Sequence, residues 1–470
     1  MNSMSYFAAT KENQGFGGIF PRQIMIVLCL VLFEIGILAA ESSIAVGEAG
    51  PRWSRDADQP AGQLFAMAKV HGLTNQVHRQ GQKIRAMRHQ GAIAGAEFNS
   101  EETTILSYSS DKTVRFWDVA TCRPVGPVLR HQGGIEGAIF NSDGTRILTY
   151  ATDKTARLWD ARTGEPRMAP LRHQGSLGSA EFNSDETLIL TYSEDKTARL
   201  WDAETGTPIG VTLRHQGAVN GAIFNTDETI LMTYSADKTV RLWDAETGEP
   251  ISEPIRHQGA VGSAEFSSDE TLILTYAEDG TARLWDAETS QPVTAPMRHR
   301  GAIGGAFFSS DETQIITYAE DGAVRHWDAE TGEPLGPTLR HQGAIGGVLF
   351  NSDETMILTF AEDKTVRLWD AVTGEAIGKP LRHQGAIGDA FFVADEAMIL
   401  TYSEDGTARF WDTESGFPIG PPIRHHGPID GVALNGDETI LLTYSSDKTI
   451  RLWDVSGLYE DGDTLIESLC

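Results

Sequence analysis

A histidine, a hydroxyl residue and an aspartate recur together nine times in this sequence at fixed spacing. In one copy, His173 is followed by Thr191 and Asp195. These residue types could form a catalytic triad, in which the histidine activates a hydroxyl nucleophile and the carboxylate orients the histidine. Nine near-identical copies argue against that chemistry, because an enzyme has no need of nine equal sites. We therefore expect these residues to be structural and the protein not to be an enzyme.

Metal binding is the second chemistry that repeated histidines suggest. A histidine lies 28 residues before each of nine Trp-Asp pairs: His89, His131, His173, His215, His257, His299, His341, His383 and His425. Outside the pair His425-His426, no cysteine or second histidine stands at ligand spacing. The motifs GxxxxGK[ST], HExxH and GxSxG are absent from the sequence. The sequence thus predicts neither a metal nor a cofactor.

The elements that must position these residues follow a strict period. The tryptophans of the Trp-Asp pairs are 42 residues apart every time, at 117, 159, 201, 243, 285, 327, 369, 411 and 453. Residues 173–202 and 257–286 are identical at 25 of 30 positions, which indicates duplication of one unit. A fixed period of this length predicts a repeat architecture in which each unit is one supersecondary element.

One unit, residues 341–382, shows what that element is. Residues 345–350 and 356–360 are short apolar runs on either side of a turn cluster. Residues 365–369 alternate, with Thr365 predicted outward, Val366 inward, Arg367 outward and Leu368 inward. A weaker fourth strand follows a Thr-Gly turn. Four short antiparallel strands per unit, without a helical period, are typical of a propeller blade.

The pattern His, Ser/Thr, Asp, Trp-Asp resembles the WD-repeat family over residues 79–454. The usual Gly-His opening appears here as Arg-His. The resemblance implies a hydrogen-bonded tetrad in each blade, and Ser107 replaces threonine in the first. Three of the implied tetrads are His173, Thr191, Asp195 and Trp201; His257, Thr275, Asp279 and Trp285; and His341, Thr359, Asp363 and Trp369.

The expected fold is all-β, a propeller of nine four-stranded blades in one closed ring. Seven blades with two surplus units are the alternative, but no linker interrupts the period, and orphan blades would expose strand edges. Residues 82–88 precede His89 as the outer strands precede later histidines. We expect them to complete the last blade, with the tail 455–470 as a competitor for that edge.

The resemblance also places partner contacts on the turns between the second and third strands. The residue before the turn aspartate is acidic in five units: Glu194, Glu278, Glu320, Glu362 and Glu404. Such an acidic arc suits basic peptides, although solvated turns are often acidic for no functional reason. Five residues after each histidine, near the mouth of the channel, five units have glycine and one has Ala94, and the polar exceptions are Glu136, Asn220 and Asp430. These eight residues are the candidate partner-binding set.

Charge limits the partners further. The formal net charge is −28, which disfavours nucleic acid and anionic lipid head groups. A non-catalytic scaffold that binds proteins is therefore the leading hypothesis. A structural or assembly protein without a specific partner is the alternative, followed by a propeller that binds a small ligand or acts as an enzyme.

The N-terminal region differs from the repeats. Residues 1–23 are polar and positive, 24–45 contain a long apolar run with Glu34 inside it, and 46–78 are predicted to be a linker. The order of positive, apolar and small residues predicts an export signal or an uncleaved anchor. The propeller would then lie outside the cytoplasm, with membrane contact only through residues 24–45 if they are uncleaved. A cytoplasmic protein with a buried or mis-started extension is the alternative.

Overall fold

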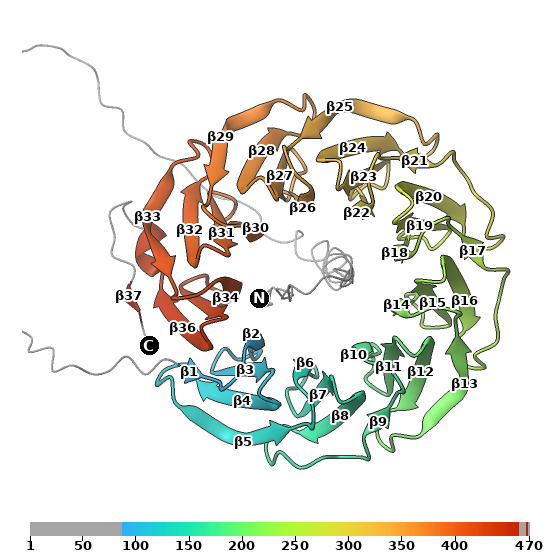
Figure 1. The fold of residues 1–470 in the computed structure, drawn as a ribbon, viewed down its shortest axis with the longest axis horizontal. Helices are drawn as coiled ribbons and strands as arrows, with labels where there is room; N and C mark the ends of the chain where they lie inside the picture. The colour runs from blue at the N-terminus through green and yellow to red at the C-terminus, as the bar shows by residue number, and fades with distance from the viewer. Residues whose placement is uncertain (1–86, 460–466, 469–470) are drawn as a thin grey trace, which may run out of the picture. The chain divides into compact units, whose positions relative to one another are not determined.

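The computed structural model describes residues 87–459 and 467–468. Within them, nine antiparallel sheets are arranged in a ring (Figure 1), which confirms the predicted all-β propeller of nine four-stranded blades over the arrangement of seven plus two. The segments 1–23, 24–45 and 46–78 lie outside the described residues. In the described part, no helix has the length and apolarity needed to cross a membrane.

Blades one to eight each consist of four strands consecutive in sequence, and in every blade the strand that comes first after the tetrad histidine lies nearest the ring axis (Figure 1). The innermost strands of blades one to nine are β2 (Ile93–Phe98), β6 (Ile135–Phe140), β10 (Leu177–Phe182), β14 (Val219–Phe224), β18 (Val261–Phe266), β22 (Ile303–Phe308), β26 (Ile345–Phe350), β30 (Ile387–Val393) and β34 (Ile429–Leu434). The second strands are β3 (Thr104–Ser109), β7 (Arg146–Ala151), β11 (Leu188–Ser193), β15 (Ile230–Ser235), β19 (Leu272–Ala277), β23 (Gln314–Ala319), β27 (Met356–Ala361), β31 (Met398–Ser403) and β35 (Ile440–Ser445).

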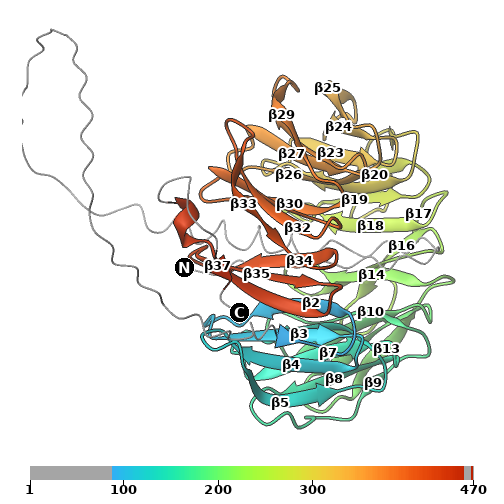
Figure 2. The same cartoon turned by 60° about the vertical axis from the view of Figure 1, so that its left-hand side comes forward.

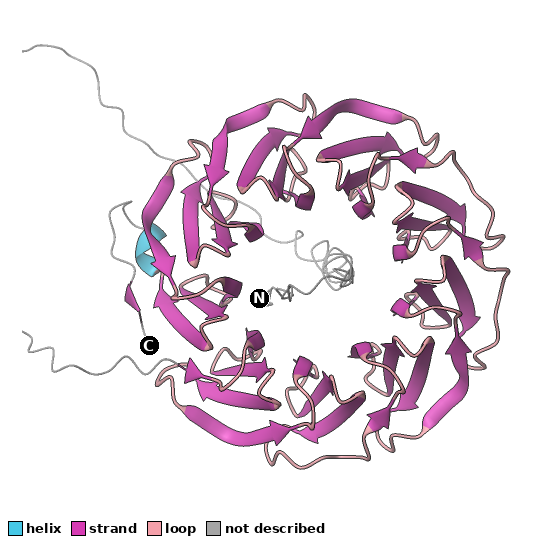
Figure 3. Ribbon diagram, viewed as in Figure 1, coloured by secondary structure: helices cyan, strands magenta, loops and turns pink. Residues whose placement is uncertain are grey.

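The outer half of each blade holds the Trp-Asp strand and an edge strand. The third strands are β4 (Thr113–Asp118), β8 (Thr155–Asp160), β12 (Thr197–Asp202), β16 (Thr239–Asp244), β20 (Thr281–Asp286), β24 (Ala323–Asp328), β28 (Thr365–Asp370), β32 (Thr407–Asp412) and β36 (Thr449–Asp454). The outer strands are β5 (Pro124–Arg130), β9 (Leu171–Arg172), β13 (Pro208–Arg214), β17 (Ile255–Arg256), β21 (Met297–Arg298), β25 (Pro334–Arg340), β29 (Ala376–Arg382) and β33 (Pro418–Arg424). A 3-10 turn, η2 (Ser456–Tyr459), follows the last blade and is the only helical element described (Figure 3).

The apolar core lies between neighbouring blades. Leu190 and Leu200 of blade three, for example, belong to one buried cluster with Val219 and Trp243 of blade four. Alternate residues of each strand face opposite neighbours, because successive side chains point to opposite faces of a sheet. Every blade therefore has two buried faces, and none can bury its apolar surface alone.

The two ends of the described chain both pair with the third strand of blade nine. Strand β1 (Met87–Arg88) pairs with Ile450 and Thr449, and β37 (Glu467–Ser468) pairs with Trp453 and Asp454. The prediction that residues 82–88 complete the last blade is confirmed for residues 87–88, and residues 82–86 lie outside the described part. The tail, predicted as a competitor, takes the other half of the same edge. Blades one and nine then meet, with β2 beside β34 and β35 (Figure 2).

A glutamate clasp joins neighbouring blades on the turn between the first two strands. Glu186 of blade three accepts hydrogen bonds from the backbone N–H of Ser142 (2.5 Å) and from Asn141 Nδ2 (2.8 Å) in blade two. The equivalent carboxylate accepts a backbone N–H of the preceding blade at eight of the nine interfaces, through Glu102, Glu186, Glu228, Glu270, Glu312, Glu354, Glu396 and Glu438. Glu102 makes this bond across the ring closure, to Gly436 N.

The interface between blades one and two lacks the clasp, because Gly144 stands where the other blades have glutamate. Its φ is 69°, close to the 59° of Glu186, and no atom lies within 4 Å of the position that a Cβ would take. The site therefore has the backbone conformation and the space for a glutamate.

Replacing Gly144 with glutamate should give a more stable ring than replacing it with alanine. The new carboxylate would accept the N–H of Ser100, and a charge-assisted hydrogen bond is worth about 1–2 kcal/mol before the cost of positive φ is subtracted. Gly144→Ala is the matched control, since alanine takes the same strained φ without a carboxylate. Denaturant unfolding should place Gly144→Glu above Gly144→Ala in stability, and equal midpoints would contradict the clasp.

Candidate functional site

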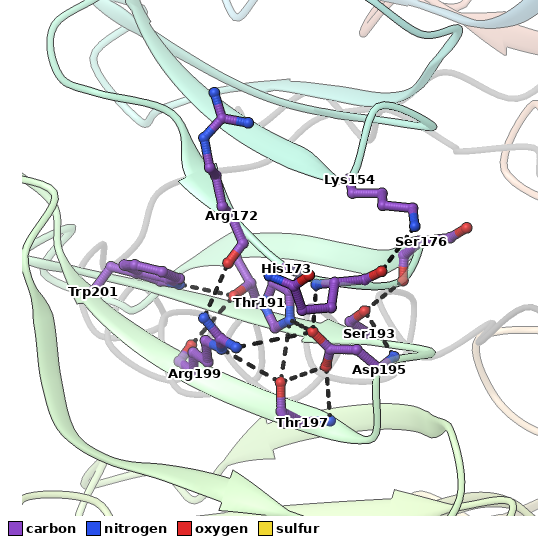
Figure 4. A network of polar contacts seen from close by, with 11 residues as sticks. Lys154, Arg172, His173, Ser176, Thr191, Ser193, Asp195, Thr197, Arg199 and Trp201 are labelled. Atoms are coloured by element: carbon purple, nitrogen blue, oxygen red, sulfur yellow. Dashed lines mark hydrogen bonds and ion pairs between the residues drawn. The ribbon is translucent and has the colours of Figure 1, made fainter.

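The polar residues of blade three form one continuous network (Figure 4). The Trp201 indole N–H donates to Thr191 Oγ1 at 2.8 Å, and Thr191 Oγ1 is 2.8 Å from His173 Nε2. His173 Nδ1 is 3.0 Å from Asp195 Oδ2. A carboxylate only accepts, so His173 carries its proton on Nδ1, and Thr191 donates to Nε2. One neutral tautomer thus pairs every member of the tetrad.

A fifth residue completes the network. Thr197 Oγ1 donates to Asp195 Oδ1 at 2.5 Å and lies 3.2 Å from His173 Nδ1. The equivalent Thr365 was expected to point outward, and that expectation is wrong, since Thr365 is buried. Its hydroxyl bonds to Asp363 at 2.6 Å, so burial leaves no polar group unpaired. The recurrence of threonine at this position in eight of nine repeats was the available signal.

The other implied tetrads have the same geometry. In blade five, Thr275 Oγ1 is 2.7 Å from His257 Nε2 and accepts the indole N–H of Trp285 at 2.8 Å, while His257 Nδ1 is 3.4 Å from Asp279. The members of the blade-seven set are likewise brought together: His341, Thr359, Asp363 and Trp369. Blade one uses Ser107, which accepts from Trp117 at 2.8 Å.

Burial sets the charge of the network. Desolvation lowers the pKa of all nine tetrad histidines, to about 4 for His131, His257 and His425, in spite of the nearby aspartates. Burial alone would raise the pKa of the Asp195 carboxyl, but hydrogen bonds from Thr197 and Gln174 N lower it overall. The histidines are therefore neutral at pH 7 and the aspartates charged.

These groups are arranged for structure and not for attack on a substrate. Thr191 has no exposed surface, and its oxygen already accepts from the Trp201 indole. A nucleophile must reach a reacting atom in a cleft. Within residues 87–459 and 467–468, no three His, Cys, Asp or Glu side chains are grouped so that they could hold a metal.

Removing one histidine should cost the ring about 1–3 kcal/mol, because its hydroxyl and carboxylate partners lose a buried hydrogen bond. His257→Ala is the variant of choice, as it leaves the exposed turns unchanged. Thermal unfolding should show the loss as a lower Tm than that of the wild type. A variant that melts with the wild type would contradict a stabilising tetrad.

The acidic candidates lie on the turns between the second and third strands. All five are exposed: Glu194, Glu278, Glu320, Glu362 and Glu404. Each immediately precedes the aspartate of a tetrad, so its backbone position is held by the network. Four of them belong to consecutive blades, five to eight, and we call Glu278, Glu320, Glu362 and Glu404 the acidic arc.

The candidates near the channel are less accessible. Glu136, Asn220 and Asp430 are half-buried on the innermost strands, and Asn220 Nδ2 donates to Val261 O of the next blade at 2.9 Å. Asn220 thus joins two blades. Burial, with the charges of Asp447 and Glu404, raises the pKa of Asp430 to about 7.

The glycines of the innermost strands have a steric cause that sequence reasoning missed. Five residues after the histidine of blade three, a Cβ on Gly178 would lie 2.3 Å from the ring of Tyr192, and one position further along in blade four, a Cβ on Gly221 would lie 1.9 Å from the ring of Tyr234. An aromatic residue recurs at this place on every second strand. The glycines make room for these rings, so the shortage of side chains there reflects packing and not an unused binding face.

The family model described as "WD domain, G-beta repeat" matches residues 81–118, 123–160, 167–202, 206–244, 248–286, 332–370, 377–412 and 421–454. The chain belongs to the WD-repeat family. No curated protein matches it. Among solved structures, the WD-repeat ring is similar to the computationally designed Ika8 protein, with a TM-score of 0.54 and 25% identity over 69% of this chain and 97% of that one.

Eight of the nine WD repeats are matched, and the one that is not is the sixth, which lies between the matches ending at 286 and beginning at 332. Its tetrad is intact, with His299 Nε2 2.8 Å from Thr317 Oγ1. Ala323, however, replaces the fifth-residue threonine, and Arg300 replaces a glutamine. WD-repeat propellers typically bind protein partners and are generally non-catalytic scaffolds.

Proposed function

We propose that this propeller is a non-catalytic scaffold that binds basic segments of other proteins on the acidic arc. The observation that carries the proposal is the exposure of Glu278, Glu320, Glu362 and Glu404 in four consecutive blades. Repeated weak contacts with one partner add up, because each further contact is intramolecular. The net charge of −28 favours the same partners by raising their rate of association.

Two further observations support binding over catalysis. The polar groups that recur in every blade are hydrogen-bonded to one another within the tetrads, and the tetrad hydroxyl groups are buried. Asp430 lies close enough to Glu404 for the two charges to interact, which extends the acidic surface toward the ring axis in blade nine.

The test is a charge-neutralised variant with a matched control. Glu278, Glu320, Glu362 and Glu404 are replaced together by glutamine, and binding of a fluorescent lysine- and arginine-rich peptide is measured by anisotropy. In the control, four exposed glutamates at the turns between the third and fourth strands are replaced instead: Glu204, Glu246, Glu288 and Glu330. Both variants lose the same charge.

We expect the acidic-arc variant to bind at least about tenfold more weakly, which corresponds to about 1.4 kcal/mol, and the control to bind nearly as the wild type does. Equal losses would show a general effect of charge and would remove the acidic arc as the site. Retained binding by the acidic-arc variant would place the site elsewhere on the ring, whereas failure of the wild type to bind the peptide would favour a structural or assembly role.

We also propose that residues 24–45 direct export or anchor the chain, with the propeller outside the cytoplasm. The support is the order of positive, apolar and small residues in the sequence. Fractionation of a C-terminally tagged chain, followed by N-terminal sequencing, tests it. Recovery in the cytoplasm with residues 24–45 intact would contradict the proposal.

A further inference from the structure

The sixth repeat carries two substitutions on one face of its blade. His326 stands where the other eight blades have leucine or phenylalanine: Phe116, Leu158, Leu200, Leu242, Leu284, Leu368, Phe410 and Leu452. Gln314 stands where six of the others have an apolar residue. His326 pairs with Ile316 across β23 and β24, and Gln314 pairs with Asp328, so the two polar side chains are diagonal neighbours. In a sequence so repetitive, two polar replacements at one place indicate a local requirement.

Both side chains line a pocket of about 310 Å³ between blades six and seven. Its apolar wall includes Leu335 of β25 and Phe350 of β26, and the exposed Val372 lies at its edge. A smaller pocket, of about 160 Å³, occupies the equivalent strands of blade three, where Leu200 and Ile209 take the places of His326 and Leu335. The larger pocket is within the size range of small-molecule sites.

His326 is buried without a polar partner. The residue is 8% exposed, and no described side chain or backbone group hydrogen-bonds its ring nitrogens, which are not among the polar atoms sealed from solvent and therefore face the pocket. Its only ring contact there is edge-to-face with Phe350, at 6.3 Å between centroids. Burial lowers the pKa of His326, so the imidazole is neutral and offers one donor and one acceptor. A ligand with a matching group could replace the water at this imidazole with a direct hydrogen bond.

We propose that this pocket binds an aromatic group that carries one neutral hydrogen-bond donor, such as a phenol or an indole, with the donor on His326. Phe350 supplies a ring for edge-to-face or offset packing, and Leu335 supplies apolar surface. The Gln314 amide is a second polar group on the same wall. The ligand is either a free small molecule or the side chain of a partner, and the inference does not depend on the acidic arc.

Charged ligands fit the pocket less well. Glu354 lines it and accepts the N–H of Ser310 at 2.8 Å, so an incoming carboxylate or phosphate would meet a negative charge. A cation would have to shed its water beside Phe350 and Leu335, and the same desolvation keeps His326 neutral. Both arguments favour a neutral donor.

The test uses p-cresol as the phenol, toluene as its counterpart without a donor, and benzylamine as the cation. Binding to the full chain is followed by ligand-observed NMR and by the resonances of the His326 imidazole. His326→Leu and Gln314→Leu introduce the residue that other blades carry at these places, so the fold should be kept. Ala323→Thr is the matched control, because it also returns the sixth repeat to the common sequence but lies outside the pocket wall.

We expect saturable binding of p-cresol that is about fivefold to tenfold tighter than that of toluene, which is the effect of one hydrogen bond. His326→Leu should abolish this preference and Ala323→Thr should keep it, while Gln314→Leu should reduce it. No saturable binding, equal binding of p-cresol and toluene, a preference that survives in His326→Leu, or stronger binding of benzylamine would each overturn the proposal.

A further arm distinguishes the two sources of the ligand. The peptide Gly-Tyr-Gly is titrated beside p-cresol. Binding of the peptide that shifts the His326 resonances assigns the pocket to a partner's side chain. Binding of p-cresol alone assigns it to a small molecule, and either result supports the aromatic donor as the shared chemistry.

Discussion

Lowering the pH from 7 to 4 should unfold the propeller. The pKa of ten buried histidines, the nine of the tetrads and His326, is lowered in the folded protein, whereas in the unfolded chain they titrate near 6.5. The stability that each contributes is complete above pH 6.5 and is lost as the pH falls through its folded-state pKa, at up to about 1.4 kcal/mol per pH unit. The unfolded state binds more protons in this window, so the effects add.

Four buried carboxyl groups oppose this trend. Burial raises the pKa of Glu97 and Glu265 to about 8, that of Asp430 to about 7, and also that of Glu181. Their contribution has the opposite sign, because it is complete below the unfolded pKa and is lost as the pH rises. Ten histidines outnumber four carboxyl groups, so the net stability still falls as the pH is lowered.

Tryptophan fluorescence and far-UV circular dichroism in denaturant series between pH 7.5 and 4 measure this slope. Glu97→Gln is a useful second variant, because it removes one of the carboxyl groups that oppose the loss of stability in acid. It should steepen the acid dependence between pH 5 and 7 by about 1 kcal/mol per pH unit. A stability that stays constant from pH 7 to 4.5 would contradict the assignment of neutral, buried histidines.

The second large effect is expected from a single methyl group. Gly221→Ala places a Cβ 1.9 Å from the ring of Tyr234, which has no exposed surface. Overpacking of a filled core costs about 1–3 kcal/mol, and this contact belongs at the upper end. Chemical unfolding should show the loss as a lower midpoint with an unchanged slope.

A double-mutant cycle isolates the cause. In a Tyr234→Ala background the ring is gone, so Gly221→Ala should cost much less than in the wild type. If the two substitutions were simply additive, the clash would not be the reason for the glycine, and the steric account of the innermost strands would have to be given up.

The repeat period was sufficient to predict the blades but not the contacts between them. In blade seven, the expected strands 345–350, 356–360 and 365–369 differ from β26, β27 and β28 by at most one residue at an end. The reason is local, because alternation and turn residues within one unit specify those strands. Ring closure through residues 87–88 could be predicted in the same way, because this stretch precedes His89 as other outer strands precede their histidines.

What the sequence did not reveal depends on neighbouring units. Glu186 has the sequence context of a solvated turn residue, and only the placement of blade two shows that it accepts the N–H of Ser142. The burial of Thr365 and the fit of Gly221 against Tyr234 also require the tertiary arrangement. His326 could not be found in this way for another reason. The pattern that the repeats share does not include a residue that occurs in one unit only.

The shared edge of β36 has a consequence for the order in which the ring is assembled. Strand β1 leaves the ribosome before any blade, yet its only partner strand belongs to the last one. Nascent blades can stack on one another as they emerge, but Met87 and Arg88 must wait until synthesis is nearly over. Met87 and Arg88 are thus translated before the blades but dock among the last residues. A ribosome that stalls within the final repeat would leave an open arc of blades, with an exposed apolar face on the blade at each end.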